Sequence, residues 1–431
     1  MQHHPVFDSA VAEAHSRPAL DVPVDHVVLS AVVLIDETKD RTAGLTETLT
    51  WADSQGFEHQ RDTEQEAVLR RGSETDAAVI KWERHTEFIS ITIVAPLALR
   101  EPAHQWLDQL LSAQQDAGSL MSKAVFEVLT APDNLSAPDQ LQQPVALVGP
   151  DAPSSRVKIW LNDRAHLLQT SLQHDDQRFV RYRLYTAPGQ PDRVGRLVQR
   201  LIEIETYRRL AFLSVPLLRD LGARIAQLDG EIDQIAQQSQ KVANAEDEAR
   251  ILEALTRLSA QLQSTGSTAA FRFSASQAYA TIVSERLDEL REERISGFQR
   301  LSVAIQRRLR PNIRSCHALE QRIDRGAQRV SYLTDLLRTR VDLTLQEQNA
   351  EVLKSIDRRT QDQYRLQKVV ETLSVAAISY YAISLVIYFL RGVEEVSATR
   401  FYEMSLVGLV PAIFMTIFIV SRLLRKKHLR H

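Results

Sequence analysis

Two uncharged apolar stretches stand out in the hydropathy pattern of the 431-residue chain, at residues 373–390 and 404–421. Each has 18 residues. As helices they would each span roughly 27 Å, close to the thickness of the apolar core of a bilayer. The pattern therefore predicts a transmembrane hairpin over residues 373–424, followed by a short basic tail at 425–431.

The first 190 residues have a different pattern, in which short runs rich in β-branched residues alternate with polar or helical stretches. Such runs, bounded by Pro, Gly and Asp, are typical of strands. Strands are expected at 26–35, 77–97, 145–150, 157–161 and 178–186, and helical spacing appears at 45–55 and 103–115. Residues 1–190 are therefore predicted to form a mixed α/β domain in the cytoplasm.

Residues 191–311 are predicted to be helical, because their apolar positions recur at spacings of three and four. Pro216 is expected to kink or break the first helix, and the segment 264–271 reads as a loop. A second helix is expected at about 274–309, with Pro311 ending it. The apolar stripe of the first helix comprises Val194, Leu197, Leu201, Ile204, Ala211, Val215, Leu218, Ile225 and Ile232.

Residues 312–390 read as one long helix that enters the membrane, of which 312–372 would form a stalk. The helix would be on the order of 115 Å long. An apolar stripe on a stalk of this kind has to be covered, either by the helices of 194–310, by further copies of the chain, or by both. A homo-oligomer is therefore expected. The heptad-like stripe comprises Leu319, Ile323, Val330, Leu333, Leu337, Val341, Val352, Ile356, Val370 and Leu373.

The distribution of charge predicts the orientation of the hairpin. Five cations follow the second apolar stretch, whereas the intervening loop mixes both signs. By the positive-inside rule, both chain ends should face the cytoplasm. The first thirty residues lack a basic start followed by an apolar core, so no signal peptide is expected to export the body.

Composition agrees with a largely soluble body attached to a lipid bilayer. Charged residues make up 25% of the chain, the formal net charge is −3 and the mean hydropathy is −0.23. There is no basic excess to indicate nucleic-acid binding. The one cysteine, Cys316, excludes an intrachain disulfide, which fits a reducing compartment.

Catalytic signatures are absent from the sequence. It contains no GxxxxGK[ST], GxGxxG, GxSxG or HExxH pattern. We therefore expect neither an enzyme nor a bound cofactor.

A cytoplasmic polar cluster is the first candidate site. If residues 81–88 form one strand, Glu83, His85 and Glu87 share a face, and such a set could hold a divalent cation. A solvent-facing polar stripe is the alternative. His15 and Arg17, near the N-terminus, could join this cluster or form a structural ion pair. Glu205 and Arg209, four residues apart, read as an ion pair on a helix surface.

The second candidate site lies on the first apolar stretch. Five polar residues, four in this stretch and one just before it, share one helical face. Hydroxyls require partners in a membrane, so this face should meet another helix or a water-filled pore. Glu394 and Glu395, in the outer loop, could concentrate cations or serve only as soluble loop residues. The polar stripe comprises Glu371, Ser374, Tyr381, Ser384 and Tyr388.

Several blocks of the sequence together resemble a bacterial family, domain of unknown function 3422, described as predicted membrane-anchored proteins. The resemblance extends over nearly the whole chain and implies a bacterial inner-membrane location, without an assigned activity. The blocks are EAHSRP (13–18), KWERHTEF (81–88), 195–212, RRLRPNIRSC (307–316) and 336–381.

The order of parts is also similar to that of CorA-type magnesium channels: an α+β cytoplasmic domain, long α-helices and a C-terminal two-helix transmembrane hairpin. The YGMNF-like signature of those channels is missing, since residues 388–395 read YFLRGVEE. Two functions remain open. The chain could be an oligomeric transporter or channel for a divalent cation or another ion, or a membrane-anchored scaffold or sensor.

Overall fold

The computed structural model describes residues 19–36, 43–73, 76–132, 157–242, 244–394, 411–412 and 415–420. The chain divides into two compact units. The first comprises Met1–Ala243 and Ala249–Leu333, and the second comprises Asn244–Glu248 and Thr334–His431. The described helices are α2 (Ala43–Ser54), η2 (Leu97–Leu99), α3 (Arg100–Ala113), α5 (Pro191–Leu210), η3 (Ala211–Leu213), α6 (Ser214–Ser239), α7 (Ala245–Glu289) and α8 (Leu301–Glu394).

A ten-stranded sheet forms the centre of the first unit, in the order β10-β7-β8-β9-β6-β1-β5-β4-β3-β2. Neighbouring strands are antiparallel except for β6 and β9, which run parallel. The strands are β1 (His26–Ile35), β2 (Glu58–Asp62), β3 (Glu66–Arg71), β4 (Ala78–Arg84), β5 (Phe88–Pro96), β6 (Gly118–Thr130), β7 (Val157–Leu161), β8 (His166–His174), β9 (Val180–Thr186) and β10 (Glu293–Arg294).

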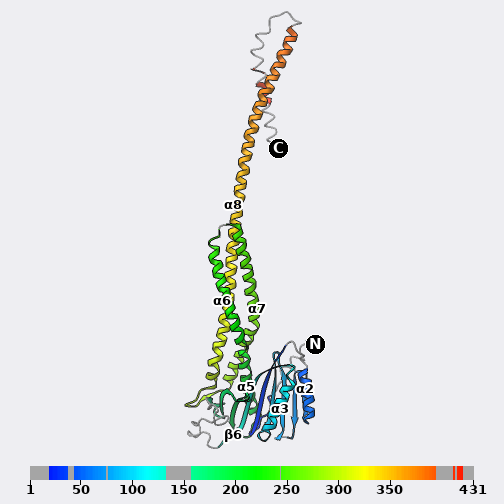
Figure 1. Cartoon of the computed structure of the whole chain (residues 1–431), viewed down its shortest axis with the longest axis vertical. Helices are drawn as coiled ribbons and strands as arrows, with labels where there is room; N and C mark the ends of the chain where they lie inside the picture. Colours follow the sequence, from blue (N-terminus) through cyan, green and yellow to red (C-terminus); the bar gives the residue numbers. More distant parts are fainter. Residues whose placement is uncertain are drawn as a thin grey trace, which may run out of the picture. The chain divides into compact units, whose positions relative to one another are not determined.

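Successive side chains of a strand point to opposite faces of the sheet, so each strand contributes to two different hydrophobic cores. On β4, Ile80 and Trp82 are buried with residues of α2 and α3, whereas Lys81 points to the opposite face. On β9, Tyr182 and Leu184 are buried with residues of α5. The sheet is therefore a middle layer, with α2 and α3 on one face and α5 on the other (Figure 1).

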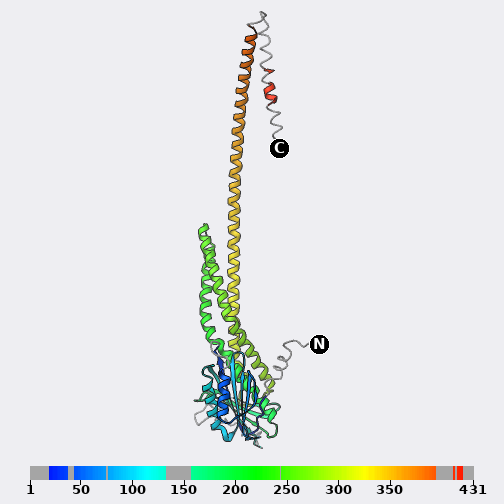
Figure 2. The same cartoon turned by 90° about the vertical axis from the view of Figure 1, so that its right-hand side faces the viewer.

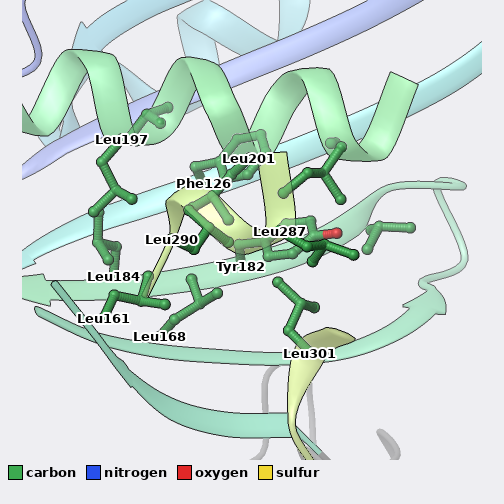
Figure 3. Packing of buried hydrophobic residues seen from close by; sticks show 14 of the residues in the cluster. Phe126, Leu161, Leu168, Tyr182, Leu184, Leu197, Leu201, Leu287, Leu290 and Leu301 are labelled. Atoms are coloured by element: carbon green, nitrogen blue, oxygen red, sulfur yellow. The ribbon is translucent and has the colours of Figure 1, made fainter. Parts of the chain in front are cut away.

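The core under α5 also receives the end of α7 and the start of α8. Leu197 and Leu201 of α5 lie over the Phe126 and Tyr182 rings, which stack with centroids 4.7 Å apart (Figure 3). Leu301, the first residue of α8, is fully buried in the same cluster. Burying an aliphatic side chain of this size contributes about 1.5–3 kcal/mol. The long helices are thus fixed to the sheet by its own hydrophobic core.

Helices α6 and α7 pack along the first part of α8 in the same unit (Figures 1 and 2). A Cβ atom added at Gly326 of α8 would lie 3.3 Å from Leu262 of α7, so the two helices approach closely there. Arg322 of α8 forms an ion pair of 2.7 Å with Asp229 of α6. The buried stripe of α8 comprises Leu301, Ile305, Leu309, Asn312, Cys316, Leu319, Ile323, Val330, Leu333 and Leu337.

Several predicted elements agree with the structure. Strands β1 and β7 occupy the expected ranges, and the expected run 77–97 is two strands, β4 and β5. The first helix is interrupted at η3, so Pro216 lies in the first turn of α6, where a proline needs no helical hydrogen-bond partner. The expected strand at 145–150 lies outside the described residues.

The loop expected at 264–271 is wrong, because α7 runs unbroken through it. The hydroxyl groups of this segment form hydrogen bonds within α7. Thr265 and Thr268 donate to the carbonyls of Gln261 and Ser264. Ala269 and Thr265 are buried against neighbouring helices. Tertiary packing overrides the low helix propensity of Ser, Thr and Gly.

Pro311 does not end a helix, contrary to the expectation, but lies inside α8. The helix expected at 274–309 is instead the end of α7 and the start of α8, separated by a turn that contains β10. A proline inside a helix costs about 3 kcal/mol. The next residue, Asn312, is buried and donates to Ala211 O and Ser214 Oγ, both at 3.0 Å, which holds α8 against the α5–α6 junction.

In the second unit, most of the described part of α8 beyond Leu337 is exposed. From residue 338 to 378 it has no buried side chain in the described chain. Apolar side chains of the predicted stripe are more than half exposed, among them Val352 at 57%, Ile356 at 54% and Val370 at 59%. The second apolar stretch is described only at 411–412 and 415–420, which are helical. A two-helix hairpin is therefore not established, whereas one long apolar helix is.

Candidate functional site

A buried charged cluster occupies the face of β3 and β4 opposite α2 and α3. Lys81 Nζ lies 2.9 Å from Glu83 Oε1 and 3.5 Å from Glu66 Oε1. Arg61 donates to Glu66 Oε2 at 2.9 Å. Lys81 and Glu66 are each 4% exposed, so these charges require one another. Thr92 pairs with Lys81 and Ser30 pairs with Thr92 across the sheet, so both add polar side chains to the same face.

A cavity of about 230 Å³ lies between this cluster and α5. On the sheet side it is lined by Lys81, Glu83, His85 and Ser90, together with the apolar Val28, Phe88 and Val94. On the α5 side it is lined by Gln199, Glu203, Thr206 and Tyr207, and Leu20 and Val22 close one edge. Ammonium, carboxylate, amide and imidazole groups thus meet in one small space. Most of the lining is apolar, and a mainly apolar cavity with a few convergent polar groups is typical of a site for a small organic ligand.

The helix side of the cavity is linked to α7 by ion pairs. Gln199 donates to Glu203 Oε1 at 3.1 Å, and Arg286 of α7 pairs with Glu203. Arg200 of α5 pairs with Glu289 of α7 at 2.7 Å. These ion pairs join the α5 side of the cavity to the end of α7.

The structure divides the predicted cluster of Glu83, His85 and Glu87. Strand β4 ends at Arg84, so His85 and Glu87 lie in the turn before β5, and the expected strand face holds only for Glu83. Glu83 and His85 both line the cavity and approach Ser90 Oγ, at 3.4 and 3.5 Å. His85 also stacks on Phe88, with ring centroids 4.1 Å apart.

Glu87 has different partners, on α7. It accepts hydrogen bonds from Arg272 at 3.1 and 3.2 Å and from the Tyr279 hydroxyl at 2.5 Å. Burial, followed by the hydrogen bond with Glu87, raises the pKa of Tyr279 well above its ordinary value. In the described part of the chain, no group of three His, Cys, Asp or Glu residues is arranged to hold a metal ion. His15 and Arg17 lie outside the described residues.

Replacing Lys81 with methionine should lower the free energy of unfolding by about 2 kcal/mol, because the buried Glu66 and the half-buried Glu83 would lose their shared cation. Chemical denaturation followed by tryptophan fluorescence measures this change. The matched control is Lys241→Met at an exposed lysine, which should change stability by less than about 0.5 kcal/mol. Equal stabilities of the two variants would contradict a structural role for the charged cluster.

A second buried network was misread from the sequence as a surface pair. Glu205 is 1% exposed and accepts hydrogen bonds from Tyr182 Oη at 2.7 Å, from Arg208 at 2.7 Å and from Arg209 at 2.8 Å. Burial alone would raise the pKa of Glu205, but Arg208, Arg209 and the Tyr182 hydroxyl outweigh it and hold the pKa below its ordinary value. Spacing along a helix cannot report that the helix lies on a sheet, and the partner Tyr182 is distant in sequence.

The polar stripe on α8 lies in the second unit. Ser374 donates to the carbonyl of its own helix at Val370, at 2.8 Å, so its hydroxyl is satisfied without a second helix. Tyr381 and Tyr388 are 69% and 76% exposed, whereas Ser384 is half-buried. Glu371 is half-buried as well. Glu394 is the last residue of α8, and Glu395 lies outside the described residues.

One helix of the described chain, α8, is long and apolar enough to cross a membrane, by length and composition. Fold and site together define a protein with an α+β sheet domain, long helices fixed to that sheet, and an apolar segment at the far end of the longest helix. The chain belongs to the family described as protein of unknown function (DUF3422), and the match covers residues 2–428. This confirms the family resemblance seen in the sequence. None of the curated proteins matches the sequence.

Proposed function

We propose that the protein is a homo-oligomeric inner-membrane protein that conducts a small ion, with a divalent cation as the first candidate. Residues 373–424 would form a two-span hairpin, with both chain ends in the cytoplasm, and the order of parts would follow that of CorA-type channels. No catalytic step is proposed.

The uncovered apolar stripe of α8 is the observation that carries this proposal. Val352, Ile356, Leu366, Val370 and Leu373 recur at heptad-related spacings and are all more than half exposed. A lone helix with such a stripe is unstable in water, whereas copies of the same helix cover one another in a coiled coil. The stripe belongs to the helix that enters the apolar segment, so an assembly through it would gather the membrane segments of several copies.

The polar side chains of the apolar segment support conduction. Tyr381, Ser384 and Tyr388 lie three and four residues apart, so they share one face of α8. In a ring of copies, this face would turn toward the common axis and provide oxygen atoms to a passing ion. Val386 lies on the opposite face of α8 and does not belong to this stripe.

A membrane-anchored sensor is the second candidate function, and the cavity beside Lys81 favours it. Its mainly apolar lining with a few polar groups suits a small ligand, and the ion pairs from α5 to α7 would link that ligand to the long helices. In this case the hairpin would serve only as an anchor.

Flux through liposomes containing the purified full chain tests the transport proposal. We expect uptake of Mg²⁺ or Co²⁺, reduced several-fold by the double substitution Tyr381→Ala and Ser384→Ala and unchanged by the control Val386→Ala. Absence of flux, or equal flux in all three proteins, would contradict a pore lined by this stripe. Replacing residues 373–424 with an unrelated hairpin separates the two functions, since only a sensor would keep its cellular phenotype.

A further inference from the structure

A second cavity, of about 890 Å³, lies between the C-terminal end of α5, strand β8 and the first turns of α8. Its charged lining consists of Arg208, Arg209, Arg307 and Arg308, with His174 beside them, and none of its lining residues is acidic. Four guanidinium groups from two helices therefore converge on one space. Arg307 and Arg308 form no ion pair with any acidic side chain of the described chain.

The positive charge of the cavity is only partly balanced. Glu205 lies behind Arg208 and Arg209 and pairs with both, so these two arginines contribute a net charge of about +1. Arg307 and Arg308 are exposed and add their full charges. Glu205 also fixes the planes of Arg208 and Arg209, which are 15% and 18% exposed. Two arginines paired with Glu205 and two exposed arginines thus line the same cavity.

The backbone at the cavity edge is strained. Strand β8 shifts register between Thr170 and His174, and Leu172 has a φ of 57°, which is unfavourable for a leucine. Leu172 N donates to Thr170 Oγ1 at 3.1 Å and Gln173 N donates to Ser171 Oγ at 3.2 Å, so side chains hold the bulge in place. Bulges of this kind recur beside binding sites, where they redirect side chains.

We infer that this cavity binds a small soluble molecule through a phosphate or diphosphate group. Guanidinium forks match the oxygen pairs of phosphate, and several arginines around one anion are typical of phosphate recognition. The volume exceeds that of a diphosphate and leaves room for an attached organic group beside Phe212 and Ile305. This binding role is independent of ion conduction.

Calorimetric titration of the full chain in detergent with inorganic pyrophosphate tests the inference. The double substitution Arg307→Ala and Arg308→Ala should weaken binding by about tenfold for each lost arginine. The matched control, Arg219→Ala with Arg224→Ala, removes two exposed arginines of α6 that do not line the cavity, and should bind as the unmodified protein does. Arg308→Lys should give an intermediate affinity, because it keeps the charge but loses the fork.

Citrate serves as a second ligand, since it carries a similar negative charge on carboxylates. We expect citrate to bind more weakly than pyrophosphate. No binding of pyrophosphate, equal affinity for citrate, or equal affinity in the Arg307/Arg308 double variant and its control would each overturn the inference. The binding measurement does not depend on liposome flux. Failure of the phosphate-binding inference can therefore be told apart from failure of the transport proposal.

Discussion

Replacing Glu205 with glutamine is expected to lower the free energy of unfolding by about 3–5 kcal/mol at pH 7. The carboxylate lies at the centre of a buried network, with Tyr182 on β9 and two arginines on α5. Glutamine has nearly the same shape, so packing is preserved. What is lost is the charge that compensates Arg208 and Arg209, which would remain largely buried as cations. Chemical denaturation in detergent measures the change.

The pH dependence of this effect has a defined sign. The pKa of Glu205 is lowered in the folded state, so the carboxylate stabilises the fold at every pH above its unfolded pKa of about 4.3. This contribution is lost as the pH falls through the lowered folded-state pKa. The stability difference between the unmodified protein and Glu205→Gln should therefore be constant from about pH 6 to 8 and shrink below about pH 4.3.

Tyr182→Phe is the matched control for the network. It removes one hydrogen bond to Glu205 but leaves every charge in place, so it should lower the free energy of unfolding by only about 1 kcal/mol. The stability difference between Tyr182→Phe and the unmodified protein should not shrink at acidic pH. If Glu205→Gln were no more destabilising than Tyr182→Phe, the ion pairs would contribute nothing beyond a neutral hydrogen bond.

Glu205 and Lys81 show which features of the structure could be predicted from the sequence and which could not. Local periodicity correctly predicted an α+β domain followed by long helices, because strand and helix patterns depend on neighbours in sequence. It misread Glu205, since a spacing of four with Arg209 looks the same on an exposed helix as on one that covers a sheet. The buried position of Lys81 was not predicted, for a similar reason. Its partners Glu66 and Glu83 meet it only through the pairing of β3 with β4.

The same limit applies to the long helices. Pro311 and the Ser- and Thr-rich segment at 264–271 are local signals that a helix is interrupted. In both places the helix continues, because contacts with other helices stabilise it. Asn312 bonds to Ala211 and Ser214, about a hundred residues earlier in the chain. Of the expected polar cluster, Glu83 and His85 lie together, whereas Glu87 accepts hydrogen bonds from Arg272 and Tyr279 of α7. Contacts between distant segments decided each case.

Replacing Ile356 with aspartate is expected to dissociate the proposed oligomer. Ile356 belongs to the exposed stripe of α8, and in a coiled coil of copies it would be buried against the same residue of its neighbours. One substitution would then place several carboxylates together in an apolar seam, which costs several kcal/mol per copy through desolvation and repulsion. Light scattering of the detergent-solubilised full chain measures the mass of the protein component.

Ala350→Asp is the matched control for this prediction, because it introduces the same charge on a different face of the same helix. It should leave the mass of the oligomer unchanged, while Ile356→Asp should yield a mass close to that of one 48.8 kDa chain. If the unmodified protein were already monomeric, a two-span chain could not enclose a pore and conduction would fail with the assembly. If both variants stayed oligomeric, the copies would have to meet elsewhere, and the uncovered stripe would instead serve a different partner.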